Sequence, residues 1–485
     1  MKRLLIILVC ISSLFLTACD PDMFMLEENN KNNIEDSPED EGLSDKDHSG
    51  NEYLRSVEKK ESLENTDILE VGQSFAIDIL TEDFDRLDNL YLYSEEMKEI
   101  ISFKETHKEI VFHNSNMGDV EKVHEPYTYK YGRSRYIMVP IEASLNNINL
   151  LVNFNKDNHI IGFSYEEYQN NTLEKSGKKP EGITEEEFSF LSDNFLIHGT
   201  LTSPDFDEDG QVLDTYPLVV LVHGFGPSDR DSSIFENKPF RDIAWGLAEA
   251  GIASYRYDKR TYLYDGLENN PVFTVFDETI NDAIVAANMA KELKNVNPNK
   301  VYILGASQGG YLLPRIASGF DSAAGYILLS SPFQNRKDYL KEQYEYLAME
   351  DGEISLKEHT KINQLNSEID KLTNPNEIPQ GESVLGFQKN YWIDLNRYDP
   401  VPGGNRITAP TLVLQGERDY QTTTKQYNLW LNAFGEKENW TFKSYPDLNH
   451  FMMKGKGKSY SDEYRQKNYV DSQVIQDIAN FIYTN

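Results

Sequence analysis

The sequence predicts two folded parts: a small α+β domain at residues 67–169 and a larger α/β domain with a mostly parallel sheet at residues 188–485. In the smaller part, helical spacing of apolar residues comes first and strand-like alternation follows, which is typical of an α+β domain. In the larger part, short apolar runs alternate with helical patterns, which predicts parallel strands covered by helices on both faces. One of these runs ends in G-x-S-x-G at 305–309, the pattern of a sharp strand-to-helix turn.

The first 18 residues have the pattern of a signal peptide, with a short basic start and an apolar run at 4–16. This run is too short to span a bilayer comfortably. The letters LTAC at 16–19 resemble a bacterial lipobox, at which signal peptidase II cuts before the cysteine. We therefore expect Cys19 to carry lipid and the protein to be an extracytoplasmic lipoprotein of a bacterial cell membrane. The alternative is a plain secretory signal, in which Cys19 has no role.

Two segments have no regular apolar pattern. Residues 19–66 are rich in Glu, Asp, Asn, Ser and Lys, and they carry too few apolar side chains to fold by themselves. They predict a disordered acidic tether with a reach on the order of 35–40 Å. Residues 170–187 contain Asn, Gly and Pro at turn-forming positions and predict a linker between the two domains.

The small domain begins with helical patterns and continues with strands. Its predicted elements are a helix at 68–80, a second helix through Tyr93, Met97 and Ile100, and strands around 137–141, 148–154 and 161–165. The turn at 155–158 joins the last two strands as a hairpin. No acid/base pair stands out in this domain, so we expect a packing or binding module.

The large domain contains an apolar strand at 216–222 that runs into His-Gly-x-Gly at 223–226. The glycines let the backbone approach a substrate oxygen, and we expect the backbone N–H of Phe225 to be one of two donors in an oxyanion hole. His223 precedes the serine of G-x-S-x-G, whereas the catalytic base of such a site follows it. We therefore interpret His223 as a residue that braces this loop.

The next elements lead to the predicted nucleophile, Ser307. They are a helix at 240–250, strands at 252–257 and 301–306, a helix at 277–294, and a strand at 327–329. At the turn after 301–306 the backbone is strained and crowded, which explains the glycines on either side of Ser307. The following helix begins with Gln308, whose backbone N–H is the expected second donor of the oxyanion hole.

Residues 333–399 interrupt the alternation of strands and helices and predict a cap inserted over the site. They contain a charged helical stretch at 337–372 and then the pair Tyr391-Trp392. Tyr391 and Trp392 are candidate residues of the substrate pocket, although a core role for Trp392 in anchoring the cap explains the pattern equally well. The pair Gly403-Gly404 is predicted to be a turn.

Two further strands, at 409–416 and 440–445, are each followed by a candidate catalytic residue. Asp419 follows the first strand and His450 the second, which gives the order serine, acid, histidine. His450 is the only histidine after Asp419, so no other histidine is a candidate for the catalytic base if Asp419 is the acid.

The acid has two rivals, Glu417 and Asp447. Asp447 lies only three residues before His450, where an aspartate is often a turn former. We favour Asp419, because the acid of this arrangement belongs after the earlier strand.

These motifs carry a resemblance to a known family. From about residue 189 onward the sequence resembles the α/β-hydrolase superfamily, and it is most similar to bacterial carboxylesterases related to the dienelactone hydrolases. The family pattern H-G-x-G-P-x-D-R-D matches residues 223–231, R-Y-D-K-R matches 256–260, and Y-W-x-D-L matches 391–395. The small domain resembles one that precedes the hydrolase in some bacterial lipoprotein esterases, a cone of the nuclear-transport-factor or ketosteroid-isomerase type.

The sequence departs from this family at two positions. Phe225 stands where a small residue is usual, and Thr261 stands where glycine commonly follows R-Y-D-K-R. Phe225 would narrow the acyl side of the pocket, so a preference for small acyl groups is a hypothesis.

The motifs and the resemblance together imply a serine carboxylesterase that acts on a small-molecule ester with a short to medium acyl chain. Ser307 is the expected nucleophile, His450 the base, Asp419 the acid, and Phe225 and Gln308 the oxyanion donors. A thioesterase, a peptidase or an acyltransferase would use the same residues, and a catalytically idle binding module of the same fold is a further alternative. A peptidase usually has a propeller domain, and no blade repeat of about 40–50 residues is seen.

Composition excludes some other functions. The chain has 47 basic and 80 acidic residues, a net charge of −33, which disfavours nucleic-acid binding. The spacings of metal ligands, a P-loop and a dinucleotide fingerprint are missing from the sequence, so neither metal nor cofactor is expected. The only membrane contact expected is the lipid on Cys19, and the oligomeric state is not predicted.

Overall fold

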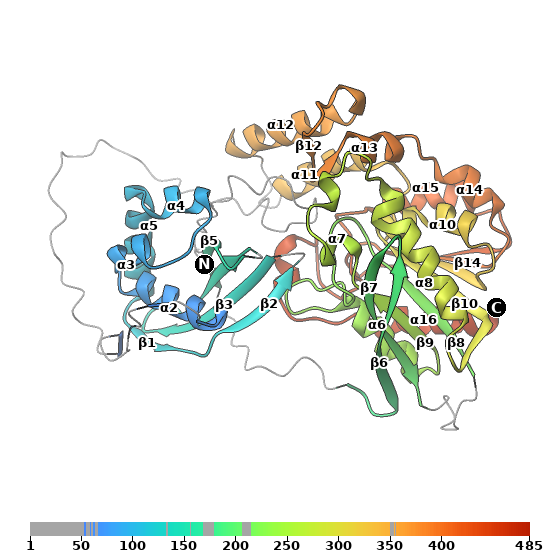
Figure 1. The fold of residues 1–485 in the computed structure, drawn as a ribbon, viewed down its shortest axis with the longest axis horizontal. Coiled ribbons are helices and arrows are strands. Elements are labelled where there is room, and N and C mark those ends of the chain that lie inside the picture. The colour runs from blue at the N-terminus through green and yellow to red at the C-terminus, as the bar shows by residue number, and fades with distance from the viewer. Residues whose placement is uncertain are drawn as a thin grey trace. The chain divides into compact units, whose positions relative to one another are not determined.

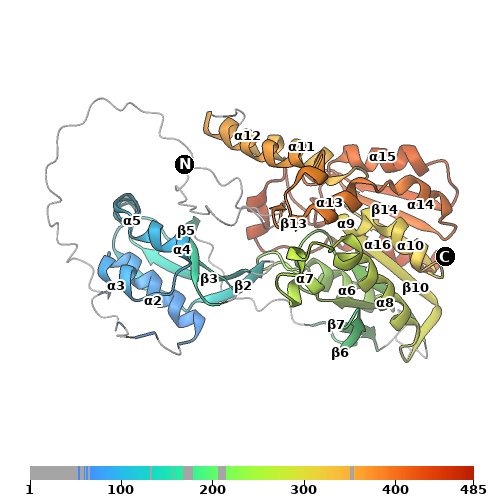
Figure 2. The same cartoon turned by 45° about the horizontal axis from the view of Figure 1, so that its top comes forward.

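The structure is a computed structural model that describes residues 53–54, 59, 62–63, 66–131, 134–155, 157–167, 179–205, 215–349, 354 and 356–485. The chain divides into two compact units between Glu174 and Lys175. Figures 1 and 2 show the helices and strands of each unit. The predicted signal peptide, Cys19 and most of the predicted tether lie outside the described residues, as does much of the predicted linker.

The N-terminal unit begins with helices that side chains cap. They are α2 (Ile68–Leu80), α3 (Phe84–Asn89), α4 (Glu95–Ile101) and α5 (Lys104–Met117). Asp67, Asp83 and Ser94 each accept a hydrogen bond from a backbone N–H of the first turn of α2, α3 and α4, which satisfies a donor that has no partner within the helix. The predicted helix at 68–80 is confirmed.

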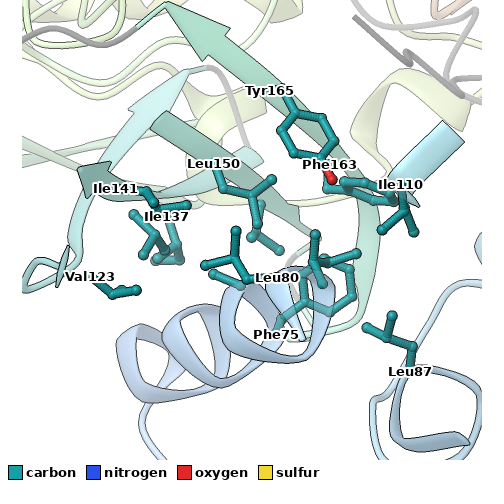
Figure 3. Close-up of a cluster of buried hydrophobic side chains, with 14 of the residues drawn as sticks. Phe75, Leu80, Leu87, Ile110, Val123, Ile137, Ile141, Leu150, Phe163 and Tyr165 are labelled. Atoms are coloured by element: carbon teal, nitrogen blue, oxygen red, sulfur yellow. The ribbon is translucent and has the colours of Figure 1, made fainter. Parts of the chain in front are cut away.

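An antiparallel sheet follows these helices. Its strands are β1 (Val120–Val123), β2 (Tyr127–Tyr131), β3 (Ser134–Ala143), β4 (Ile148–Phe154) and β5 (Ile160–Glu167). The order is β1-β3-β4-β5, and β2 also pairs with β3. Alternate residues of β3 and β4 point to one face, so Ile137 and Leu150 pack against Phe75 of α2 in a single core (Figure 3).

Two predictions for this unit are wrong in detail. The predicted tether extends too far, because Leu54 is buried in the core and Tyr53 exchanges hydrogen bonds with the backbone of Val123 at 3.2 and 3.0 Å. Tyr93 is not helical. It forms a bridge with Ile160 ahead of α4, because its hydroxyl donates to Leu87 O at 2.7 Å inside the core. The sequence pattern also missed α3, α5, β1 and β2, which are short or rich in polar residues.

The C-terminal unit is built on an eight-stranded sheet. Its strands are β6 (Ile183–Ser192), β7 (Phe195–Pro204), β8 (Tyr216–Val222), β9 (Ala253–Tyr257), β10 (Val296–Ala306), β11 (Gly325–Leu329), β14 (Thr411–Gly416) and β15 (Trp440–Tyr445). The order is β15-β14-β11-β10-β8-β9-β7-β6, with β7 antiparallel to both neighbours and the other pairs parallel. The predicted mostly parallel sheet is confirmed.

The predicted linker at 170–187 extends too far into this sheet, because β6 already begins at Ile183. Three consecutive glutamates hide the strand pattern at 185–187. They are tolerated because Glu185 accepts hydrogen bonds from Arg256 at 2.6 Å and from Trp245 at 2.9 Å.

Helices cover both faces of the sheet (Figures 1 and 2). On one face, α6 (Pro239–Glu249) and α16 (Ser472–Thr484) bury an apolar cluster that includes Leu221, Ile243 and Ile478. On the other face lie α8 (Asn281–Lys291), α10 (Leu313–Gly319) and α14 (Pro400–Arg406). Central parallel strands are therefore buried on both sides, which is why they read as continuous apolar runs.

The predicted cap lies between β11 and β14. It contains α11 (Arg336–Ala348), α12 (Leu356–Lys371), a small hairpin of β12 (Ser383–Val384) and β13 (Phe387–Gln388), and α13 (Lys389–Asn396). The predicted turn at Gly403-Gly404 is wrong, because both residues lie in α14. Pro400 at the first turn of α14 and the Asp399 side chain, which accepts from Val401 N, start this helix despite the glycines.

Candidate active site

The turn after β10 presents Ser307 at the edge of the sheet where the parallel strands end. Ser307 has φ 51° and ψ −123°, and α9 (Gln308–Tyr311) begins directly after it. Its backbone N–H donates to Leu329 O of β11 at 2.8 Å. A Cβ added at Gly309 would lie 2.5 Å from His223 O, so only glycine allows this close approach of two backbones. This turn at Ser307, called the elbow below, is therefore strained, and it is held by β11 on one side and by the backbone of His223 on the other.

Asp419 and His450 meet on the loops that follow β14 and β15. Oδ2 of Asp419 lies 2.7 Å from Nδ1 of His450, and both side chains are almost fully buried. Oδ1 accepts the backbone N–H groups of Gln421 and Thr422, each at 2.8 Å, and Oδ2 accepts the Thr422 hydroxyl at 2.7 Å. Gln415 adds a donor at 3.1 Å. These donors hold the carboxylate in one orientation toward the imidazole.

The two rival carboxylates do not contact this histidine. Glu417 is exposed and accepts a hydrogen bond from the Ser444 hydroxyl at 2.7 Å. Asp447 is exposed as well, and its backbone carbonyl accepts from Gly455 N at 2.9 Å. Of the three carboxylates that the sequence offers, the structure pairs Asp419 with His450.

Ser307 follows β10 and His450 follows β15, and the end of β11, which lies between these strands, contacts both residues. Ser330, which follows the β11 residue that binds the Ser307 amide, donates its hydroxyl to His450 O at 2.7 Å. Among the described residues, the Ser307 hydroxyl has no hydrogen-bond partner and is left for a substrate. Catalytic hydrogen bonds commonly shorten only when substrate binds. Ser307 is thus partly exposed at the same sheet edge as the Asp419–His450 pair.

The loop after β8 lies against the elbow. A Cβ at Gly224 would be 3.1 Å from Cβ of Ser307, so this loop passes directly beside the serine. Among the described residues, the backbone N–H groups of Phe225 and Gln308 have no acceptor. Both amides are thus available to an oxygen near Ser307, as an oxyanion hole requires.

His223 takes the bracing position that the sequence predicts. Its Nε2–H donates to Tyr257 O at 2.7 Å, and its ring stacks on Phe240 with centroids 4.6 Å apart. Burial lowers the pKa of His223 to about 3, only partly offset by the hydrogen bond to Tyr257. A neutral imidazole bound in this way fixes the start of the loop and takes no part in proton transfer at neutral pH.

A buried carboxylate that the sequence analysis did not single out lies beneath the site. Glu278, in the π-helical turn η3 (Phe276–Ile280), is fully buried. Its Oε1 accepts from Gly226 N at 2.9 Å and from Lys259 Nζ at 2.6 Å. Its Oε2 accepts from Gln308 Nε2 at 2.9 Å and from the Tyr391 hydroxyl at 2.7 Å. No local sequence pattern marks it, because Asn281 and Asp282 lie on the same side of this helical segment.

Lys259, in the R-Y-D-K-R motif, is as buried as its partner and also donates to Gly224 O at 2.6 Å. Burial lowers the pKa of Lys259 below its usual value, and the adjacent Glu278 opposes that shift. Burial, reinforced by Glu278, raises the pKa of Tyr391 well above its usual value, so its hydroxyl stays a donor. A buried ion pair of this kind is tolerated because both carboxylate oxygens and the ammonium have further hydrogen-bond partners.

The strand order places a serine elbow after the central strand β10 and places Asp419 and His450 after β14 and β15, at one end of the sheet. These features define the architecture of the C-terminal unit. Esterase EstD of Thermotoga maritima is 39% identical over 267 residues, which are 55% of this chain and 62% of EstD. The C-terminal unit has the α/β-hydrolase fold. The chain spans less than two thirds of the length of this relative, and no protein-family model matches it.

Solved structures similar to this chain include two esterases. Est1E from Butyrivibrio proteoclasticus is 17% identical, with a TM-score of 0.39, and the match covers 62% of this chain and 99% of Est1E. Acetyl xylan esterase from Paenibacillus sp. R4 is 16% identical, with a TM-score of 0.39, covering 65% and 86% of the two chains. At such scores these likenesses add nothing to the assignment of the hydrolase fold, which stands on the strand order and the elbow.

Tyr391 and Trp392, the predicted pocket residues of the hydrolase, are both fully buried. Trp392 Nε1–H donates to Val384 O at 2.9 Å, which places the indole in the interior of the cap. Tyr391 binds Glu278, and its ring packs on Phe387 with centroids 4.0 Å apart. Tyr391 therefore links the cap, through Glu278, to the loop after β8, whereas Trp392 is a core residue of the cap.

In the part of the chain that the structure describes, no cluster of three or more His, Cys, Asp or Glu side chains could hold a metal ion. Within the same residues, no helix is long and apolar enough to cross a membrane.

Proposed function

We propose that the C-terminal unit is a serine carboxylesterase that cleaves esters through an acyl-enzyme intermediate. The observation that carries the proposal is the 2.7 Å contact between Asp419 and His450, on the same sheet edge as the Ser307 elbow. The 39% identity to a protein named as an esterase supports the same class of reaction.

In the proposed mechanism, Ser307 Oγ attacks the ester carbonyl carbon while His450 Nε2 takes its proton. Asp419 holds the imidazole in the required tautomer and stabilises its cation, and the Phe225 and Gln308 amides bind the oxyanion. The carbon–oxygen bond to the alcohol then breaks, and the alcohol leaves with the proton from His450. Water attacks the acyl carbon by the same steps, and the carboxylic acid is released.

A preference for short acyl groups is part of the proposal. The Phe225 ring has the Arg336 guanidinium 3.7 Å from its centroid and the Phe387 ring at 5.1 Å, so it is a rigid, bulky wall. Because Phe225 lies in the loop beside Ser307, this wall restricts the space next to the carbonyl. Phe225→Ala should therefore shift the preference toward longer acyl chains while keeping the backbone N–H.

The direct test is initial-rate hydrolysis of p-nitrophenyl acetate, butyrate and octanoate by the full chain, beside Ser307→Ala. We expect saturable turnover that is fastest on the shorter chains and that falls by roughly 10³-fold or more in the variant. Equal, near-background rates in both proteins would refute the proposal. Acyl thioesters, peptide anilides and alternative acyl acceptors, assayed in parallel, test for a thioesterase, a peptidase or an acyltransferase.

We also propose that Cys19 carries a lipid that anchors the protein outside the cytoplasm. The support is the apolar run that ends in LTAC at 16–19. In a bacterial host, a labelled fatty acid should be incorporated into the chain, which should fractionate with membranes. Cys19→Ser should abolish the label. A wild-type chain that takes up no label would exclude the anchor.

A further inference from the structure

The Glu278–Lys259 pair contacts both ends of the oxyanion loop. Lys259 Nζ donates to Gly224 O, and Glu278 Oε1 accepts from Gly226 N. The residue between these two fixed points is Phe225, whose N–H is left without an acceptor among the described residues. The pair thus forms hydrogen bonds with Gly224 O and Gly226 N–H, on either side of Phe225, and leaves the Phe225 N–H available.

The second oxygen of the same carboxylate contacts the other half of the proposed oxyanion hole. Glu278 Oε2 binds the side chain of Gln308, the residue whose backbone N–H is the second donor. It also accepts the hydroxyl of Tyr391, from α13 of the cap. One buried carboxylate therefore joins the oxyanion loop, the head of the elbow helix and the cap.

We propose that Glu278, with Lys259, is a positioning residue that sets the distance between the two oxyanion donors and couples it to the cap through Tyr391. This inference rests on the proposed esterase function. Glu278 touches no reacting atom. It acts through the backbone N–H of Gly226 and the side-chain amide of Gln308, and so holds the two donor residues in the orientation that the tetrahedral intermediate needs. Preorganised donors of this kind act chiefly on the transition state.

A matched control exists four residues further along the same helical segment. Asp282 is as buried as Glu278, and it binds Arg260, the residue after Lys259, at 2.9 and 2.5 Å. Arg260 otherwise binds Ser192 and Asp193, at the β6–β7 turn. The two ion pairs thus resemble each other in burial and chemistry, but only the first contacts the oxyanion loop.

The experiment compares Glu278→Gln with Asp282→Asn in the full chain. We expect Glu278→Gln to lower kcat roughly 10²- to 10³-fold with KM changed less than about threefold, because the loss is in transition-state stabilisation. A trifluoromethyl ketone, which forms a hemiketal oxyanion with Ser307, should lose affinity by a similar factor. Asp282→Asn should lower the melting temperature and leave kcat and ketone affinity near those of wild type.

A double variant at Glu278 and Lys259 distinguishes a loss of positioning from a loss of folding stability. Glu278→Gln alone leaves the Lys259 ammonium buried without its counterion, whereas Glu278→Gln with Lys259→Met removes both charges. We expect the double variant to regain melting temperature but not kcat, because Gly224 and Gly226 have both lost their charged partners. Recovery of full kcat in the double variant would overturn the proposal, as would a kcat for Glu278→Gln within threefold of wild type. An equal loss of kcat in Asp282→Asn would do the same.

Hydrogen exchange separates this inference from the proposed function. Backbone amides at 224–226 should exchange faster in Glu278→Gln than in wild type and be unchanged in Asp282→Asn. If the wild-type chain hydrolyses no ester, the esterase proposal fails, and the exchange rates still decide whether Glu278 orders this loop. Unchanged exchange at 224–226 would refute the positioning role.

Discussion

The Thr422 hydroxyl lies 2.7 Å from Oδ2 of Asp419, the same oxygen that faces His450. The same hydroxyl lies 2.9 Å from Ser330 O and 3.3 Å from Nδ1 of His450. Thr422 therefore ties the acid of the proposed triad to the strand end beside the nucleophile.

Thr422→Val should lower kcat roughly tenfold, because it removes one donor to the carboxylate, a loss of about 1.5 kcal/mol for a charged hydrogen bond. The measurement is steady-state hydrolysis of p-nitrophenyl butyrate. Ser444→Ala is the control, since Ser444 donates to the exposed Glu417 at 2.7 Å. A variant at Thr422 that keeps the wild-type rate would show that the remaining donors to Asp419 suffice.

Asp419→Asn should lower kcat by roughly 10³- to 10⁴-fold with little change in fold, because the amide favours the wrong imidazole tautomer. Glu417→Gln and Asp447→Asn should retain wild-type rates, because both carboxylates are exposed and away from His450. The same ester assay, with circular dichroism as a check of folding, compares the three variants. Greater loss in either of the last two would reassign the acid.

The stability of the hydrolase should depend on the protonation of His223. Its pKa is lowered to about 3 by burial, whereas an unfolded histidine has a pKa near 6.5. The unfolded state therefore binds the extra proton, and stability is fully present above about pH 6.5 and is lost as pH falls toward 3. The expected slope is about 1 kcal/mol per pH unit.

Urea unfolding between pH 4 and 7 tests this, with His223→Gln as the comparison, because glutamine can still donate to Tyr257 O. The variant should have a smaller slope of unfolding free energy against pH than the wild type. Identical slopes in the two proteins would mean that His223 is protonated in the folded state.

Gly309→Ala should prevent the elbow from forming its close contact. The added Cβ would lie 2.5 Å from His223 O, a distance that requires one backbone to move. Overpacking of this kind costs about 1–3 kcal/mol and would also displace Ser307. A lower melting temperature and a large loss of esterase rate are expected. Gly162→Ala, where a Cβ meets nothing within 4 Å, serves as the neutral comparison.

In the N-terminal unit, Asp78 is fully buried and binds Arg86 through both oxygens at 3.0 and 2.9 Å and the Tyr91 hydroxyl at 2.5 Å. Asp78→Asn removes the buried carboxylate that pairs with Arg86 and Lys59, and it should destabilise this unit by about 3–5 kcal/mol. Thermal unfolding followed by tyrosine fluorescence measures the loss. Glu95→Gln, which breaks an exposed pair with Lys98, should leave the transition unchanged. Equal behaviour of the two variants would contradict the prediction.

The sequence by itself determined the parallel sheet and the order of its functional loops. Central strands buried on both faces must be apolar throughout, and the motif at 305–309 requires glycines on each side of the turn, so both features are visible in local patterns. The helix at 68–80 was also predictable from a local pattern, because its apolar residues recur at the spacing of helical turns. Chain order alone limited the candidates for the acid that pairs with His450 to three carboxylates, Glu417, Asp419 and Asp447.

Only the tertiary structure decided what depends on contacts between distant segments. The choice of Asp419 over Glu417 and Asp447 rests on where two loops meet, and the burial of Trp392 rests on how the cap folds on itself. Glu278 is the clearest case. Its four donors lie 19 to 113 residues away in the sequence, and no local pattern distinguishes it from a surface glutamate. A buried charge is tolerated only where the fold brings its partners, and that is a property of three dimensions.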